Sequence, residues 1–374
     1  MSERSTTAGT DIVDTRYWHS VGEGRVQCDV CPRGCRMHDG QRGLCFVRGA
    51  EQGRVKFYSY GRSSGFCVDP IEKKPLNHFL PGSAVLSFGT AGCNLACKFC
   101  QNWDMSKSRE MDTLADRASP TELAAAAERL GCASIAYTYN DPTVFIEYAI
   151  DVARAARERG VRSVAVTAGY ICPQPRAEFF AHMDAANIDL KGFTEDFYRK
   201  VCGAELGAVL DTLEYVHRET RVWLEVTTLL IPGLNDSDAE LTAMCDWFAG
   251  HLGVDVPLHF TAFHPDWKMR DVPPTPLSTL VRARRIAQQH GLRYVYTGNL
   301  RDAEGGTTYC HGCREPVIER DGYEIVGWAL GADGQCRACG APCAGVFTGE
   351  PGHWGGRRAR VTLNTTGSAA PPTH

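Results

Sequence analysis

The sequence has no excess of positive charge and no long apolar run, and both absences narrow the range of functions. Its 40 Lys and Arg residues are balanced by 44 Asp and Glu residues, which gives a formal net charge of −4. Nucleic acid is not an expected partner, because no broad basic surface is available for a phosphate backbone. No segment approaches about 18 uninterrupted apolar residues, so we expect no membrane partner. Residues 1–18 also lack a basic stretch followed by an apolar run, so we expect a cytoplasmic protein.

The composition does not fit a disordered chain or a coiled coil. Hydrophobic residues make up 43% of the chain and charged residues 22%, as in ordinary globular proteins. The length of 374 residues predicts two to three structural units at about 150 residues each.

Cysteine is the residue type in excess. The chain has 17 cysteines, which is too sparse for a disulfide scaffold and far more than an average cytosolic enzyme carries. Their clustering indicates metal ligands, in three groups: Cys28, Cys31, Cys35 and Cys45; then Cys93, Cys97 and Cys100; then Cys310, Cys313, Cys336 and Cys339, with Cys343 as a further candidate. The scattered ones, Cys67, Cys132, Cys172, Cys202 and Cys245, are predicted to be small buried hydrophobic residues.

Residues 84–297 alternate short apolar runs with stretches of helical period, which is typical of repeated βα units and a parallel sheet. The predicted strands are 85–89, 134–138, 163–167, 186–190, 222–230 and 256–262, with 294–297 as a candidate seventh. The predicted helices are 123–130, 143–159, 206–219, 237–252 and 276–290, and Ser119 with Glu122 forms a capping box before the first. Chemistry is expected in the loops that follow the strands.

Four parts of the chain are expected. Residues 1–83 form an N-terminal Cys-rich segment and lead-in, and residues 84–300 form the βα core. Residues 309–347 form a small Cys module, and residues 349–374 are predicted to be a disordered tail because they have little to bury.

The central cysteines Cys93, Cys97 and Cys100 directly follow the first predicted strand with C-x3-C-x2-C spacing. Three thiolates do not complete a tetrahedral zinc site, and ordinary iron–sulfur clusters take four cysteines. If they hold a four-iron cluster, one iron keeps an open position for a small chelating molecule. The alternative is a structural site that a distant fourth cysteine closes.

This C-x3-C-x-aromatic-C loop resembles the signature of radical SAM enzymes. The resemblance implies a partial (βα)6 barrel, a [4Fe–4S] cluster on the three cysteines, and S-adenosylmethionine (SAM) bound to the open iron by its amino and carboxylate groups. It further implies that one electron cleaves SAM to methionine and a 5′-deoxyadenosyl radical, which abstracts hydrogen from a protein or small-molecule substrate. A reductant such as flavodoxin or ferredoxin is then an expected partner.

Two turns after strands provide candidate SAM contacts. Asn140 and Asp141 stand where activating enzymes of glycyl-radical proteins carry a Ser-Gly-Gly-Glu-Pro-like turn that holds the SAM amino group. Thr167 begins a Thr-Ala-Gly turn where the related enzymes have a Thr-Asn-Gly-like turn. The structural alternative for the first turn is an Asn-Asp-Pro turn with a helix N-cap.

Later strands provide four more candidate cofactor contacts. Asp189 and Lys191 resemble an Asp-x-Lys motif that reaches SAM in pyruvate formate-lyase activating enzymes, and a buried structural ion pair is the alternative. Glu225 and His259 are predicted to point into the barrel, where a polar residue is costly without a partner or ligand.

Longer segments give a narrower resemblance. The stretches at 69–83, 87–106, 263–269 and 296–300 resemble the radical SAM member of the AmmeMemoRadiSam system, over roughly residues 25–347. Those proteins are described as related to pyruvate formate-lyase activating enzyme, so activation of a glycyl-radical enzyme is one form of the expected function. The resemblance implies Memo-like and AMMECR-type proteins as partners and leaves the substrate open. The alternative from another class is a metal-cluster electron-transfer or binding protein without radical chemistry.

The outer cysteine groups are expected to hold metals as well. Cys310-x2-Cys313 and Cys336-x2-Cys339 indicate a zinc-ribbon-like or rubredoxin-like site, with iron as the alternative to Zn²⁺. Such a short segment needs the metal to fold. The N-terminal group provides four thiolates within 18 residues, which suit either a structural zinc or an auxiliary iron–sulfur cluster.

Overall fold

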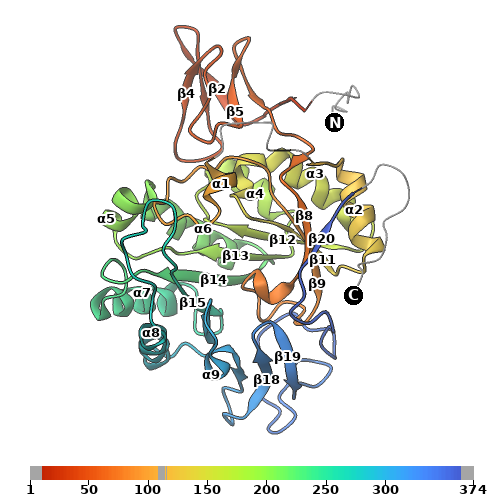
Figure 1. The fold of residues 1–374 in the computed structure, drawn as a ribbon, viewed down its shortest axis with the longest axis vertical. Helices are drawn as coiled ribbons and strands as arrows, with labels where there is room; N and C mark the ends of the chain where they lie inside the picture. Colours follow the sequence, from red (N-terminus) through yellow and green to blue (C-terminus); the bar gives the residue numbers. More distant parts are fainter. Residues whose placement is uncertain (1–10, 108–113, 115, 364–374) are drawn as a thin grey trace.

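The computed structural model describes residues 11–107, 114 and 116–363. Its centre is a nine-stranded sheet in the order β16-β15-β14-β13-β12-β11-β9-β8-β20 (Figure 1). The strands β9 to β16 of this sheet are mutually parallel. Their bounds are β9 Ala84–Phe88, β11 Ser134–Tyr137, β12 Arg162–Thr167, β13 Ala185–Asp189, β14 Trp223–Leu230, β15 Leu258–Ala262 and β16 Val295–Gly298. The predicted α/β partial barrel is confirmed, including the candidate seventh strand.

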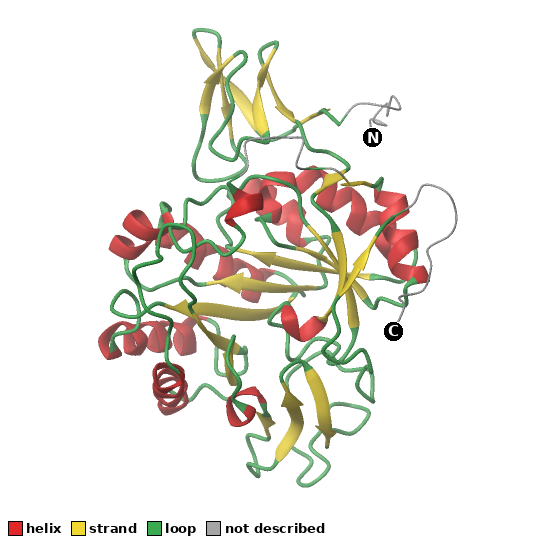
Figure 2. Cartoon of the chain, in the orientation of Figure 1, coloured by secondary structure: helices red, strands yellow, loops and turns green. Residues whose placement is uncertain are grey.

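Helices follow these strands along the outside of the sheet (Figure 2). The longer ones are α2 Pro120–Arg129, α3 Ile146–Arg157, α4 Pro173–Phe180, α6 Leu206–Glu219, α7 Asp238–His251 and α8 Leu277–Gln289. The predicted capping box is present at α2, where the Ser119 side chain accepts from the Glu122 backbone N–H. The predicted helix at 143–159 begins with a short 3-10 segment, Pro142–Phe145, before α3. Helix α4 was not predicted from the sequence, because its apolar residues do not lie along one face of the helix.

The N-terminal part contains two small antiparallel sheets and contributes a strand to the core. One sheet has the order β2-β3-β4 and the other β1-β6-β5. The bounds are β1 Val13–Asp14, β2 Trp18–Gly22, β3 Arg25–Cys28, β4 Arg36–His38, β5 Arg48–Glu51 and β6 Arg54–Phe57. The two-residue strands β7 Arg62–Ser63 and β10 Asp116–Arg117 pair with each other. Strand β8, Phe66–Pro70, comes from the predicted lead-in but pairs antiparallel with β9.

The C-terminal part lies at the end of the molecule opposite the N-terminal sheets (Figure 1). Its elements are α9 Ala303–Gly306, β17 Thr308–Tyr309, β18 Pro316–Asp321 and β19 Glu324–Trp328. The prediction of a disordered tail from residue 349 is wrong for the described part, because β20 Ala359–Val361 pairs with β8. Residues 364–374 of that predicted tail lie outside the described residues.

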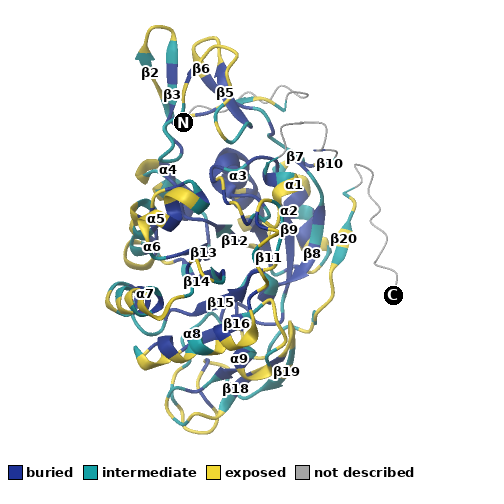
Figure 3. Cartoon of the chain, turned by 60° about the vertical axis from the view of Figure 1, so that its left-hand side comes forward, coloured by how far each residue is buried: buried dark blue, intermediate teal, exposed yellow. Residues whose placement is uncertain are grey.

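The buried side chains lie mainly between the sheet and its helices (Figure 3). Of the scattered cysteines, Cys132, Cys202 and Cys245 are buried as predicted, whereas Cys67 and Cys172 are partly exposed. In the described part of the chain, each helix is too short or too polar to cross a membrane.

Candidate active site

The main candidate site is a cavity of about 310 Å³ at the carboxyl ends of the parallel strands. Because those ends meet at one edge of the sheet, residues far apart in the sequence line it together. The predicted site residues that line it are Cys93, Cys97, Cys100, Asn140, Asp141, Thr167, Asp189 and Lys191. Thus the three central cysteines share one cavity with five of the seven predicted cofactor contacts.

The central cysteine loop is held by hydrogen bonds to the segments on both sides of it. The backbone N–H groups of Ala96 and Lys98 donate to the carbonyls of Cys202 and Val201, at 2.8 and 2.9 Å. The latter two residues belong to the helical turn Tyr198–Cys202, which follows the short helix α5, Glu195–Phe197. After the loop comes the short helix α1, Trp103–Ser106, and Cys100 Sγ lies 3.0 Å from Ser106 Oγ. The loop is therefore anchored independently of any ligand.

The thiols of this loop differ in their ease of ionisation. Burial raises the pKa of Cys93 to about 12. A hydrogen bond from Cys202, followed by the charges of Lys191 and Lys107, lowers the pKa of Cys97 to about 7 against the effect of burial. Metal ligation requires thiolates, and these two cations favour that form.

Asn140 and Asp141 connect the cysteine loop to neighbouring strands. The Asn140 carbonyl oxygen accepts from the Thr90 N–H at 3.0 Å, and its amide nitrogen donates to the Gly92 carbonyl at 2.8 Å. The Asp141 carboxylate accepts from Thr167 Oγ1 at 3.0 Å and from the Thr143 N–H at 2.9 Å, where it caps the 3-10 segment. The predicted structural role of this turn is therefore present, and both residues also line the cavity.

Asp189 and Lys191 form an ion pair in the cavity wall, with Lys191 Nζ 2.7 Å from Asp189 Oδ2. Burial acts to lower the pKa of Lys191, but Asp189 and the nearby thiols raise it well above its usual value. Lys191 therefore stays charged and presents a fixed cation to the cavity.

Thr227 on β14 provides a further polar group that the site-residue prediction did not include. It lines the cavity, and its Oγ1 is buried with no hydrogen-bond partner in the described part of the chain. A buried hydroxyl without a partner is destabilising unless a ligand satisfies it. Together with three thiols, a carboxylate and an amine, this hydroxyl gives a donor set that fits a cluster and the zwitterionic end of SAM.

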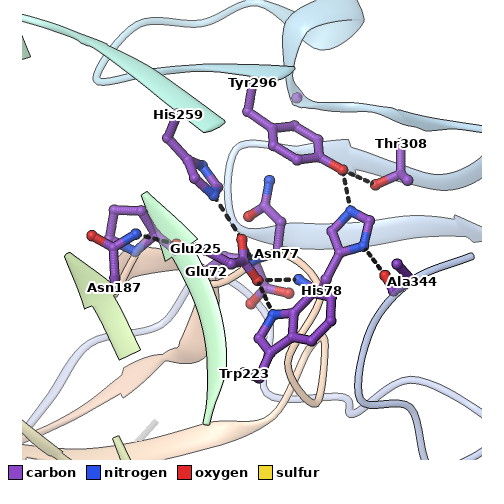
Figure 4. Close-up of polar contacts among 12 residues, drawn as sticks. Glu72, Asn77, His78, Asn187, Trp223, Glu225, His259, Tyr296, Thr308 and Ala344 are labelled. Carbon is purple, nitrogen blue, oxygen red and sulfur yellow. Dashed lines mark hydrogen bonds and ion pairs between the residues drawn. The ribbon is translucent and has the colours of Figure 1, made fainter. Parts of the chain in front are cut away.

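Glu225 and His259 lie away from this cavity, in a separate buried network (Figure 4). The Glu225 carboxylate accepts from the Asn77 and His78 backbone N–H groups at 2.9 and 2.8 Å, and from Trp223 Nε1 at 3.0 Å. His259 Nε2 lies 2.7 Å from Glu225 Oε2. Burial acts to raise the pKa of Glu225, but the hydrogen bond from His259 and the other donors lower it. Glu225 is buried inside the barrel as predicted, but its carboxylate accepts hydrogen bonds from protein groups and needs no ligand.

The network continues to the C-terminal part (Figure 4). The His78 ring nitrogens contact the Tyr296 hydroxyl and the Ala344 carbonyl, and the Tyr296 hydroxyl lies 2.7 Å from Thr308 Oγ1. Burial lowers the pKa of His78 to about 4, so this ring is neutral at physiological pH. The hydrogen bonds of His78 and Tyr296 thus join the C-terminal part to the barrel through neutral groups.

A second cavity of about 630 Å³ adjoins the first and shares Pro75, Thr261 and Asn299 with it. Its polar lining includes His259, Glu72 and Arg320. Glu72 and Arg320 were not predicted as site residues, because each stands in an ordinary charged stretch of the sequence. Burial raises the pKa of Glu72 to about 7, and its Oε2 has no hydrogen-bond partner among the described residues.

The C-terminal cysteines form a compact group. Cys310, Cys313, Cys336 and Cys339 have sulfur atoms that all lie within 4.8 Å of one another. The Cys310–Cys339 and Cys313–Cys336 sulfur pairs are 3.5 and 3.7 Å apart. Four thiolates around one zinc at about 2.3 Å have sulfur atoms about 3.8 Å apart, so the geometry agrees with a zinc-ribbon-like module. The further candidate Cys343 is not part of the group.

The N-terminal cysteines Cys28, Cys31, Cys35 and Cys45 line a third cavity, between the small sheets and the central cysteine loop. The cavity is also lined by Asn94, the neighbour of Cys93. The two cysteine groups are therefore close in space.

Comparisons with known proteins find similarity to radical SAM proteins. The sequence profile of the radical SAM superfamily matches residues 88–245. The uncharacterized protein MJ0808 of Methanocaldococcus jannaschii is 41% identical over 82% of this chain and 91% of its own length. The pyruvate formate-lyase-activating enzyme of Clostridium pasteurianum is 23% identical over 48% of this chain and 80% of its own length. A radical SAM methyltransferase from Sphaerobacter thermophilus superposes over 77% of each chain, with 14% identity and a TM-score of 0.47.

Proposed function

The chain belongs to the radical SAM superfamily, and we propose that it is an enzyme that removes hydrogen from a substrate through a cluster held by Cys93, Cys97 and Cys100. The observation that carries the proposal is the single cavity that these cysteines share with polar residues from neighbouring strand ends. Such a loop supplies three of the four thiolates of an ordinary cluster and leaves one iron open. When bound, the cluster and SAM supply a one-electron cleavage that yields methionine and a 5′-deoxyadenosyl radical.

The chain's own residues are proposed to bind and orient SAM. The fixed charge of Lys191 and the carboxylate of Asp189 complement the carboxylate and the amine of the methionine end. The unpartnered Thr227 hydroxyl offers a further hydrogen bond. Asn140, Asp141 and Thr167 would position the cysteine loop and the cavity wall, because their side chains already bond to the backbone there.

The adjoining second cavity is the proposed substrate position. It shares lining residues with the first cavity, so a molecule bound there would lie next to the proposed SAM position. Its buried polar groups, the Glu72 carboxyl and the Arg320 guanidinium, favour a polar substrate or a polar segment of a protein. The similarity to the activating enzyme of Clostridium pasteurianum supports activation of a glycyl-radical protein as one form of this reaction.

We further propose that the chain is the radical SAM member of the AmmeMemoRadiSam system. The motif segments at 69–83, 87–106, 263–269 and 296–300 support this assignment. Memo-like and AMMECR-type proteins are then proposed partners, with flavodoxin or ferredoxin as reductant. Cysteines clustered as metal ligands, in place of a disulfide framework, support a reducing cytoplasmic compartment.

The proposal is tested by 5′-deoxyadenosine formation from SAM, using anaerobically reconstituted protein reduced with dithionite and incubated with and without the candidate partners. Cys100→Ala should lower the yield by at least about 100-fold, because the cluster loses a ligand. Cys132→Ala removes a buried thiol outside the site and serves as the matched control. Equal turnover by Cys100→Ala and the unaltered protein would contradict the assignment of this loop. No cleavage by a fully loaded protein, with any partner, would favour an electron-transfer protein.

A further inference from the structure

The three cysteine groups differ in how closely their sulfur atoms approach. Among the residues that the structure describes, the C-terminal group alone brings three or more His, Cys, Asp or Glu ligand atoms within 4.8 Å of one another. Cys28, Cys31, Cys35 and Cys45 are all described, so no three of their thiols lie that close. The described central cysteines, which family membership assigns to an iron–sulfur cluster, do not form so close a group either.

A wider separation of the cysteine sulfur atoms favours a metal cluster over a single zinc ion. A tetrahedral zinc site holds its sulfur atoms about 3.8 Å apart, because each Zn–S bond is about 2.3 Å. A four-iron cube is wider and is bound at its corners, so its thiolates lie farther apart. The four N-terminal cysteines line a common cavity of about 20 Å³. The same fold therefore contains one group with zinc-like sulfur spacing and two groups whose sulfur atoms are not gathered that closely.

The surroundings of the N-terminal group suit an anionic cluster. Apolar side chains complete the cavity lining, namely Val30, Met37, Leu44 and Val144. The guanidinium of Arg48 also lines the cavity, with a side-chain exposure of 2%, and it is held by the Val144 carbonyl and by Glu147. Apolar walls limit the access of water to such a cluster, and the buried Arg48–Glu147 pair fixes a guanidinium in the cavity lining.

Only a short segment of backbone separates this group from the central cysteines. A Cβ atom on Gly92 would lie 1.9 Å from the Cys45 carbonyl oxygen, so the backbones are in direct contact and the position requires glycine. The next residue, Cys93, lines the first cavity, and Asn94 lines the third. Arg33 adds a hydrogen bond of 2.9 Å to the Asn94 carbonyl.

We propose that Cys28, Cys31, Cys35 and Cys45 bind a four-iron cluster that passes electrons to the central cluster. A low-potential one-electron donor of the ferredoxin or flavodoxin class reduces the N-terminal cluster, which is oxidised again as the central cluster is reduced. Cys31, Cys35 and Cys45 are partly exposed and Leu44 is 46% exposed, so a donor can approach this end of the molecule. The relay rests on the proposed function, whereas cluster binding by these four cysteines does not.

The composition of the full-length protein after anaerobic reconstitution tests the site. We expect about eight iron atoms, eight sulfides and one zinc per chain, because two clusters take four irons each. The variant Cys93→Ala/Cys97→Ala/Cys100→Ala should keep about four irons and four sulfides and show the electron paramagnetic resonance (EPR) spectrum of the N-terminal cluster alone. Adding Cys28→Ala and Cys31→Ala should remove this iron. About two zinc ions and at most about four irons in the unaltered protein would overturn the proposal, even if a variant fails to fold.

The relay is tested by freeze-quench EPR of the central cluster during reduction by ferredoxin. In Cys28→Ala/Cys31→Ala the central signal should form at least about tenfold more slowly than in the unaltered protein, because the connecting centre is lost. Cys245→Ala, which removes a buried thiol on α7, is the matched control. Equal rates in all three proteins would overturn the relay. Cleavage of SAM by the dithionite-reduced double variant would show separately that the central site functions.

Discussion

At the scale of single residues, the pKa values of two buried carboxyl groups near the second cavity, Glu225 and Glu72, are shifted in opposite directions. Glu225 accepts hydrogen bonds from two backbone N–H groups and from two side chains, and these donors lower its pKa against burial. Glu72 accepts from the Gly82 N–H and lies 3.9 Å from Arg320, but its Oε2 has no partner among the described residues, so burial dominates and raises its pKa to about 7. Neighbouring carboxyl groups therefore differ in protonation near neutral pH because their donors differ.

Glu72 should make stability depend on pH in a defined direction. Its pKa is about 7 in the folded state and 4.5 as the ordinary value, so the folded state keeps a proton between these values. Unfolding then releases a proton, and stability falls as pH rises through this window, by up to about 3 kcal/mol. Urea denaturation at about pH 5 and about pH 8 measures the effect. Glu72→Gln should show a smaller decrease than the unaltered protein.

The same measurement on the exposed Glu128→Gln gives a matched control, because Glu128 lies on the surface of α2. Comparing variants also cancels the titration of metal ligands, which all of these proteins share. If Glu72→Gln and Glu128→Gln lose the same stability between the two pH values, Glu72 is ionised in the folded state.

At the scale of elements, the parallel strands and α2 could be predicted because their signals are local. Apolar runs of β-branched residues mark β12 and β14, and Ser119 with Glu122 marks the start of α2. The cysteine spacing also identified the central loop, because three thiols must act together at that distance in the sequence. Each of these features depends on residues within a few positions of one another.

Features that depend on distant partners were not predictable. Strand β20 pairs Ala359 with Val68, and nothing in the Gly- and Arg-rich stretch around it indicates that partner. Alternation along β14 correctly points Glu225 inward, but it does not indicate that the Asn77 and His78 backbone satisfies the carboxylate. Likewise, four clustered cysteines predict a metal, while the separation of their sulfur atoms distinguishes a zinc ion from a larger cluster.

At the scale of the whole molecule, the N-terminal sheets and the C-terminal strands β18 and β19 lie at opposite ends of the long axis, with the barrel between them (Figure 1). The N-terminal cysteine group and the central loop are in backbone contact at Cys45 and Gly92, whereas the four-cysteine module belongs to the opposite, C-terminal part. The module contacts the barrel through the His78–Ala344 and Tyr296–Thr308 hydrogen bonds, beside the second cavity. Arg320 of β18 also donates to the Asn77 carbonyl at 2.7 Å. The module therefore supports the wall of the proposed substrate position from outside.

Loss of the metal from this module should unfold it locally and leave the barrel folded. A structural zinc supplies an apparent ~10–16 kcal/mol in finger-like peptides, and the module has only a small core of its own. In Cys336→Ala/Cys339→Ala, the amides of β18 and β19 should exchange with solvent at least about tenfold faster, while those of β13 and β14 stay protected. Hydrogen exchange measured by mass spectrometry resolves these segments.

The matched control is Cys343→Ala, which removes a thiol of the same module outside the four-cysteine group. Unchanged protection in the double variant would mean that packing against the barrel folds the module without metal, and faster exchange in β13 and β14 would mean that the module and the barrel unfold as one unit.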